Sequence, residues 1–290
     1  MRAMGSAEAG AAGRSAAPRA GAGRYRAAAC QFEPLLLDKE ANLERMEDLV
    51  RRAAAEGARL AVFAECCVTG YGVGRDGYGM IELAEPVEGR KRGPSVRRME
   101  RVAADTGVQV VFGMPESAAG ARVHNSAVIV DPGGAPTVAH RKAHLWGAEG
   151  KIFTPGDSFV PRTAPEGLLG PLVCYDLDYP EASRTLVMRG AEVLTVCNAF
   201  PRPWIDYQRT YAVARAMENS VYVILANYLG RVRTFDFFGG SVIVDPYGRV
   251  LAEAGTEEAV LVVDVDLDLV ARARKELGYL AGRRPELYAE

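Results

Sequence analysis

An α/β fold with mixed sheets is the fold class that the sequence predicts. Strand-length apolar runs alternate with helix-length amphipathic segments along nearly the whole chain after residue 24, the pattern of strands connected by helices. Two turn sequences, Asp-Pro-Gly-Gly at 131–134 and Asp-Pro-Tyr-Gly at 245–248, follow strand-like runs and predict antiparallel neighbours as well. With 290 residues, 49% of them hydrophobic, the chain can bury one large core.

The first half of the predicted domain starts with a strand at 25–32 and a helix at 39–55. Apolar residues recur every three or four positions in this helix, so one face can be buried, and Gly57 follows as a stop. The short apolar run at 60–63 is typical of a buried strand. The remaining elements of this half are a helix at 95–105, a strand at 108–114 and a hairpin of 127–130 with 137–141.

The second half repeats the alternation of strands and helices. Pro171 lies inside the strand before Cys174 and removes a donor from the hydrogen-bond ladder, which predicts an edge position or a bulge there. No interior linker rich in Pro, Gly or Ser divides the chain, so we expect one domain over 25–290. The predicted strands are 172–175, 193–197, 221–226, 241–244 and 259–265, and the predicted helices are 180–189, 205–219 and 267–275.

The N-terminal residues 1–24 are almost entirely Ala, Gly, Arg, Ser and Pro. Such a segment has too little apolar surface to offset the entropy of ordering it, so we expect a disordered tail. It lacks the apolar core of a secretory signal. A transit peptide is the alternative, disfavoured because Gly is abundant and amphipathicity is weak.

Composition also indicates which binding partners, which cell compartment and which cofactors are expected for this chain. A formal charge of −2 gives no support for nucleic acid or an anionic membrane as the main partner, and no run approaches the roughly 18 apolar residues of a membrane span. Five cysteines, an odd number without a CxxC pair, favour a reduced, cytoplasmic setting. The three histidines form no HExxH or Cys/His quartet, so we expect no metal.

Three short segments carry a reactive side chain directly after a buried strand. They contain Glu65, Lys142 and Cys174. Ligands of α/β sheets bind in the crevice at the carboxyl ends of the strands, so these three side chains can meet there. A thiol with a pKa near 8.5 needs a base to take its proton, a partly buried carboxylate can be that base, and an ammonium can stabilise an oxyanion. The three together are the composition that a covalent hydrolase requires.

Each of these residues also has an ordinary structural interpretation. A glutamate at a strand end is commonly solvated or paired, and Lys142 lies in a basic run with Arg141. Cys174 ends an apolar run, where a cysteine is usually an inert core residue, as we expect for Cys30 and Cys197. The functional interpretation depends on the three occurring in order inside longer motifs.

Those longer motifs resemble the nitrilase, or carbon–nitrogen hydrolase, superfamily over residues 25 to 288. The similar segments are Glu65 with the following Thr-Gly-Tyr, Arg-Lys-x-His-Leu around Lys142, and Cys-Tyr-Asp-x-x-Tyr-Pro-Glu from Cys174. Later matches are Ala-Arg-Ala-Met-Glu-Asn at 214–219, Asn227, Gly-Gly-Ser at 239–241 and the turn at 245–248. The ordered set indicates the superfamily and its amidase-like branch.

The resemblance implies a four-layer α-β-β-α sandwich and a Glu-Lys-Cys triad without metal, nucleotide or other cofactor. It assigns Glu65 as general base, Lys142 as oxyanion stabiliser and Cys174 as nucleophile, with the N–H of Tyr175 as second oxyanion donor. Glu149, which precedes Phe-Thr-Pro-Gly at 153–156, would orient Lys142 and the substrate.

The chain differs from many members of the superfamily at a position that bears on substrate specificity. Asp178 stands where they carry an arginine, which argues against substrates that depend on that arginine and resembles an amidase branch with an acid there. We favour a structural ion pair of Asp178 with Arg184, and contact with a cationic or amine-bearing substrate is the alternative. His144 is expected to be structural. The expected pocket rim is Tyr71, Trp146, Asn198, Phe200 and Trp204.

Several functions remain open at this point. The leading one is cysteine-dependent hydrolysis of a small carboxamide through a thioester, and a nitrilase or an N-carbamoyl amide hydrolase is a close variant. An acyl transferase would pass the same thioester to an amine, which hydroxylamine competing with water would reveal. A non-catalytic scaffold is disfavoured because all four key residues are present. Homodimers or larger homo-oligomers through the helices at 180–189 and 205–219 are the family habit.

Overall fold

The structure, a computed structural model, describes residues 23–72, 75–164 and 167–288. The predicted disordered tail at 1–24 lies outside the described residues except for its last two. Arg24 already belongs to the first strand, β1 (Arg24–Gln31), and its guanidinium lies 3.2 Å from the carboxylate of Asp266. The first strand therefore starts one residue earlier than predicted.

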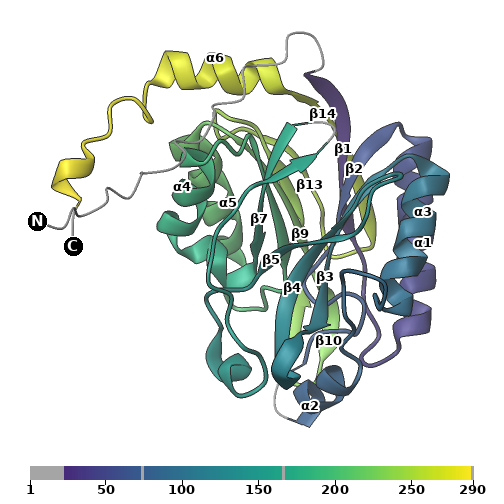
Figure 1. Cartoon of the computed structure of the whole chain (residues 1–290). Helices are drawn as coiled ribbons and strands as arrows, with labels where there is room; N and C mark the ends of the chain where they lie inside the picture. Colours follow the sequence, from purple (N-terminus) through teal and green to yellow (C-terminus); the bar gives the residue numbers. More distant parts are fainter. Residues whose placement is uncertain (1–22, 73–74, 165–166, 289–290) are drawn as a thin grey trace, which may run out of the picture.

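The first of two six-stranded sheets contains the N-terminal half of the chain and one late strand. β1, β2 and β3 run parallel, and β14, β4 and β5 are antiparallel to their neighbours. The helices α1 (Lys39–Ala55) and α3 (Pro94–Thr106) pack on its outer face (Figure 1). The strand order is β14 (Ala259–Asp266), β1, β2 (Ala58–Val62), β3 (Gln109–Ser117), β4 (Val123–Val130) and β5 (Thr137–Arg141).

The second sheet is built from the later half in the same way. β7, β8 and β9 are parallel, and the other neighbours are antiparallel. The two sheets have the same pattern of parallel and antiparallel neighbours when the first is read from β14 to β5 and the second from β6 to β13. The sequence itself shows no repeat. The helices α4 (Pro180–Met188) and α5 (Ile205–Asn219) cover its outer face (Figure 1). The strand order is β13 (Val250–Glu253), β12 (Val242–Val244), β9 (Tyr222–Asn227), β8 (Val193–Asn198), β7 (Gly167–Val173) and β6 (Arg162–Ala164).

The two sheets pack face to face, which gives the four layers α-β-β-α. Side chains of β1 alternate between the two faces because successive residues of a strand point in opposite directions. Ala27 and Ala29 belong to the core between the sheets, whereas Ala28 and Cys30 pack under the outer helices with residues such as Leu43. The predicted fold class is confirmed, including the layer order that the resemblance implied. Among the described residues, no helix is long and apolar enough to cross a membrane.

Short elements account for most differences from the predicted pattern. The predicted strand at 172–175 ends at Val173, because Cys174 has a φ of 45° and starts a 3₁₀ helix, η3 (Cys174–Asp178). The prediction for 172–175 was wrong at this end. The sequence pattern also missed β6, β13, α2 (Arg75–Glu82), β10 (Leu229–Val232), β11 (Phe235–Phe238) and the 3₁₀ helices η1 (Ala119–Ala121), η2 (Gly147–Lys151) and η4 (Pro285–Leu287). The last α-helix, α6 (Leu267–Leu277), lies outside the four layers (Figure 1).

Pro171 occupies an unpaired edge within the second sheet. Its strand β7 pairs with β8 on one side over Leu169 to Val173, but β6 covers the other side from Gly167 to Leu169 and ends there. The missing N–H of Pro171 therefore breaks no ladder on that side. The predicted edge position is confirmed.

Candidate active site

Three loops meet at the carboxyl ends of β2, β5 and β7. Glu65 lies three residues after β2, Lys142 directly follows β5, and Cys174 directly follows β7. The backbone N–H of Glu65 donates to the carbonyl of Asn198 at the end of β8, at 3.3 Å. Strands from both sheets therefore bring the three predicted side chains to one place.

A buried ion-pair cluster forms the floor of this site. Lys142 Nζ donates to Glu65 Oε1 at 2.7 Å and to Glu149 Oε1 at 2.9 Å. All three side chains are inaccessible to solvent. One ammonium between two carboxylates leaves a formal charge of −1, and such a buried arrangement is stable only if the charges are also hydrogen-bonded.

Neutral donors hydrogen-bond to three of the four oxygens of the two carboxylates. Asn125 Nδ2 donates to Glu65 Oε1 at 2.6 Å. The hydroxyl of Tyr71 donates to Glu149 Oε1 at 3.0 Å, and the backbone N–H of Trp146 donates to Glu149 Oε2 at 2.7 Å. Within the described residues, Oε2 of Glu65 has no hydrogen-bond partner. That oxygen is the acceptor of the cluster that remains available.

The pKa values of the cluster follow from its burial and its charges. Burial, together with the negative charge of Glu149, raises the pKa of Glu65 to about 7, although Lys142 lowers it. The thiol of Cys174 lies near enough to lower the Glu65 pKa slightly, although no hydrogen bond between them meets standard geometry. Burial, followed by the negative charge of Glu65, raises the pKa of Cys174 well above its usual value. At neutral pH this cysteine is therefore a thiol that needs a base.

Cys174 occupies a sharp strand-to-helix turn. Its φ of 45° lies in the left-handed region, which costs a non-glycine residue roughly 1–3 kcal/mol and persists only when the surroundings impose it. The surroundings include Asp176, two residues on, which accepts hydrogen bonds from His140 Nε2 and His144 Nδ1, each at 2.8 Å. These bonds lower the pKa of Asp176 although its burial opposes this. They also tie the turn of Cys174 to the segment that carries Lys142, so His144 has the structural position that we predicted.

A cavity of about 160 Å³ opens above Cys174. This is smaller than the roughly 300–1,000 Å³ typical of pockets for drug-sized ligands, so it suits a small substrate. Seven of the eleven lining residues are aromatic. The lining consists of Tyr71, Trp146, Cys174, Tyr175, Asp178, Ala199, Phe200, Pro201, Trp204, Tyr207 and Tyr211.

The predicted rim agrees with this lining at every residue except Asn198. The Asn198 side chain is fully buried and donates to Gln208 and Asn227, so it lies in a polar network outside the lining. The prediction that Asn198 forms part of the rim was wrong, because β8 extends through Asn198 and the chain reaches the cavity only at Ala199.

Sequence reasoning missed the two tyrosines of α5 and the buried amide of Asn125. Tyr207 and Tyr211 are four residues apart and thus share one helix face. Asn125 lies in a polar His-Asn-Ser run inside β4, a buried strand. Both patterns were available in the sequence as signals.

The family of the chain follows from comparison with known proteins. The family model described as Carbon-nitrogen hydrolase matches residues 26–275. The chain belongs to the carbon–nitrogen hydrolase family. It is therefore a hydrolase that acts on carbon–nitrogen bonds, and the predicted superfamily is confirmed.

Several relatives of this hydrolase are amidases by name. It is 37% identical to an (R)-stereoselective amidase of Pseudomonas sp over 87% of its own length and 89% of the relative's. It is 33% identical to an omega-amidase of Mus musculus, over 86% and 92% of the two chains. A crystal structure of an amidase from Nesterenkonia sp. superposes with a TM-score of 0.79 at 30% identity, covering 92% of this chain and 96% of that one. In a glutamate-to-glutamine variant of that amidase, acrylamide is added to the active-site cysteine.

Asp178 does not form the ion pair that we predicted for this hydrolase. Arg184 donates to the backbone carbonyl of Glu218 instead, and Oδ1 of Asp178 is buried without a hydrogen-bond partner among the described residues. The nearby Arg215 donates to the backbone carbonyl of Asp178, not to its carboxylate. The predicted Asp178–Arg184 pair was therefore wrong, because Arg184 on α4 reaches the carbonyl of Glu218 near the end of α5 instead.

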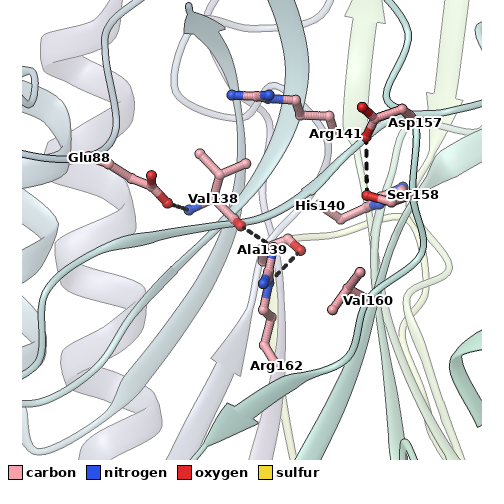
Figure 2. A pocket seen from close by; sticks show the side chains of 9 residues that line it. All are labelled: Glu88, Val138, Ala139, His140, Arg141, Asp157, Ser158, Val160 and Arg162. Atoms are coloured by element: carbon pink, nitrogen blue, oxygen red, sulfur yellow. Dashed lines mark hydrogen bonds between the residues drawn. The ribbon is translucent and has the colours of Figure 1, made fainter. Parts of the chain in front are cut away.

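A larger cavity, of about 210 Å³, lies along β5 away from Cys174 (Figure 2). Its polar groups already have partners. Glu88 accepts from the backbone N–H of Val138, and Arg162 donates to the carbonyls of Val138 and Ala139. None of the described residues that line this cavity of the carbon–nitrogen hydrolase is a cysteine, so the smaller cavity, which Cys174 lines, is the candidate active site. Within the described residues, no His, Cys, Asp and Glu side chains gather in a set that could hold a metal ion.

Proposed function

We propose that this carbon–nitrogen hydrolase converts a small carboxamide to a carboxylic acid and ammonia, with Cys174 as the nucleophile. The observation that carries the proposal is that Cys174 lines the 160 Å³ cavity and also lies beside Glu65, which is hydrogen-bonded to Lys142. Names of the relatives favour an amide over a nitrile as substrate.

In the first half-reaction, Glu65 takes the thiol proton as Cys174 attacks the amide carbon. Its pKa of about 7 suits this role, because a general base works best when its pKa lies near the operating pH. The carbonyl oxygen becomes an oxyanion, and Lys142 Nζ with the N–H of Tyr175 would stabilise it. Glu65 then gives the proton to the leaving nitrogen, ammonia departs, and the acyl group stays on Cys174 as a thioester.

In the second half-reaction, Glu65 takes a proton from water as the water oxygen attacks the thioester. The second oxyanion collapses, the carbon–sulfur bond breaks, and the proton returns to the thiolate of Cys174. The net change is amide plus water to carboxylic acid plus ammonia. Glu149, held by Tyr71 and the Trp146 N–H, would keep Lys142 in position throughout.

An ammonia-release screen of the purified protein tests this function. We expect turnover of small aliphatic, aromatic or amino-acid amides and slower or no turnover of nitriles and N-carbamoyl compounds. Added hydroxylamine should divert part of the acyl product to the hydroxamate, since both nucleophiles attack one thioester. Faster turnover of nitriles than of every amide would contradict the assignment, and exclusive transfer to hydroxylamine without any acid would indicate a transferase.

A homo-oligomer formed through α4 and α5 is a further part of the proposal. Met188 on α4 and Met217 on α5 are 50% and 43% exposed, so both helices carry apolar surface that a second copy could cover. Light scattering coupled to size exclusion at several concentrations should show a dimer or a larger assembly. A strict monomer at every concentration would rule this out.

We also propose a cytoplasmic location. All five cysteines are unpaired and buried, as suits a reducing compartment. Recovery of the native protein from an extracytoplasmic fraction of its cells would contradict this proposal.

A further inference from the structure

We propose that Asp178 is a specificity-determining residue that receives a protonated amine of the substrate, so that the favoured substrates are short amides bearing an ammonium group. This inference rests on the proposed amide hydrolysis and names the class of amide. It goes beyond the cysteine chemistry, because Asp178 takes no part in the bond-breaking steps.

The position of Asp178 places it beside the reacting group. It lines the same cavity as Cys174 and ends the same 3₁₀ helix, η3, four residues later. A 3₁₀ helix rises about 2 Å per residue, so the two backbone positions are separated by roughly 8 Å along its axis. A substrate with its carbonyl at Cys174 and a short chain beyond it can therefore reach the Asp178 carboxylate.

One oxygen of the Asp178 carboxylate is left for a ligand by the part of the chain that the structure describes. Among the described residues, its Oδ1 is buried and has no hydrogen-bond partner. Arg215 donates to the backbone carbonyls of Leu177 and Asp178 and pairs with Glu218. A buried carboxylate oxygen without a donor is costly, and a ligand that supplies an N–H donor removes that cost.

The rest of the cavity also suits a cation. Asp178 is the one charged side chain among the described residues that line it, and most of the others are aromatic. Aromatic faces attract an ammonium group through their negative π-clouds. Trp146 and Trp204 stand edge to face with ring centroids 6.1 Å apart, and Tyr207 and Tyr211 lie on the neighbouring face of α5.

The charges around Asp178 leave its carboxylate ionised at neutral pH. Burial raises its pKa to about 6, Arg215 and Lys142 lower it, and Asp176 raises it. The cluster of Glu65, Lys142 and Glu149, which Tyr71 of the lining contacts, adds a further formal charge of −1. A substrate cation is thus attracted both by Asp178 and by the excess of carboxylates.

Pairs of amides that differ only in an ammonium or a methyl group test the proposal. The pairs are glycinamide with propanamide, 3-aminopropanamide with butanamide, and 4-aminobutanamide with pentanamide, compared at about pH 7, where the amines are protonated. In at least one pair we expect the amine to be hydrolysed with a higher kcat/KM, by roughly tenfold to a hundredfold, the range for a hydrogen bond to a charged group. Asp178→Asn should abolish that preference, because it lowers kcat/KM for the amine much more than kcat/KM for the neutral amide.

Asp206→Asn is the matched control. It removes the same charge from the exposed first turn of α5, beside Tyr207 in sequence but outside the cavity lining. It should retain the preference for the amine. The proposal is overturned if no pair shows a preference in the wild-type protein, if the preference survives Asp178→Asn, or if that variant loses activity equally on both members of a pair.

Calorimetry separates this proposal from the proposed function. Cys174→Ala should bind 3-aminopropanamide or its homologues more tightly than the neutral partners, and the added Asp178→Asn substitution should remove the difference. This binding does not need turnover. Loss of all Cys174-dependent amide hydrolysis with retained amine binding would count against the proposed function alone, whereas equal binding of amine and neutral amide would count against the role of Asp178 alone.

Discussion

Cys174→Ala is expected to abolish ammonia release, lowering kcat by roughly 10⁴-fold or more, as loss of the nucleophile does in other covalent hydrolases. The thiol is the atom that carries the acyl group, and no other cysteine lines the cavity among the described residues. Steady-state assays on the best amide of the screen measure this. Intact-mass spectra should show alkylation by acrylamide at one site in the wild-type protein and none at that site in the variant.

Cys197→Ala is the control for this substitution. Cys197 is also buried and its pKa is also raised well above the usual value by burial, but it lies inside β8 and away from the cavity lining. This variant should keep its activity and its acrylamide adduct. If Cys174→Ala retains turnover, or if Cys197→Ala loses it while remaining folded, the assignment of the nucleophile is wrong.

The sequence predicted the fold well where elements are long and their pattern is regular. The helices α1 and α5 have the predicted bounds because apolar residues recur along one face and no breaker interrupts them. α2 escaped prediction because Gly77 and Gly79 lower its helix propensity. Space is also tight at both glycines: a Cβ at Gly77 would lie 2.1 Å from Ile152 Cδ1 and a Cβ at Gly79 would lie 2.7 Å from Leu37 Cδ1, so these side chains would have to shift.

Hairpins without the usual turn residues were also beyond sequence reasoning. β10 and β11 are four residues each, and their turn contains Arg233 with a φ of 51°, where Asn or Gly is the usual signal. Tertiary contacts stabilise such a turn. Arg233 hydrogen-bonds to Asp76, which is distant in the sequence.

The candidate site divides into a part that local sequence predicts and a part that depends on packing. Glu65, Lys142 and Cys174 each follow a recognisable apolar strand, so their positions could be inferred from pattern and motif. That the Asp178 carboxylate is left without an arginine partner could not be inferred in this way. It depends on the packing of α4 and α5, which directs Arg184 and Arg215 to backbone carbonyls. Oppositely charged residues at suitable spacing are therefore a weak basis for predicting an ion pair at a site.

Glu65→Gln is the second substitution with a large expected effect, a loss of about 10²- to 10⁴-fold in kcat/KM. Glutamine keeps an oxygen that can accept from Lys142 and Asn125, so the fold should persist, but it cannot take a proton from Cys174. The pKa of Glu65 is raised to about 7, so its carboxyl is neutral below that pH and ionised above it. For the wild-type protein, kcat/KM should thus fall about tenfold per pH unit as the pH drops below about 7.

The pH profile of Glu65→Gln tests the role of Glu65 more directly than the rate loss does. The substrate should be a neutral amide, which has no ammonium group for Asp178 to bind. With this substrate, the fall in kcat/KM below about pH 7 (the acidic limb of the profile) should disappear in the variant. Glu181→Gln, which removes an exposed carboxylate from the first turn of α4, should keep both the wild-type rate and the limb. If the same limb persists in Glu65→Gln, another group accepts the thiol proton, and Glu65 only holds Lys142 in place.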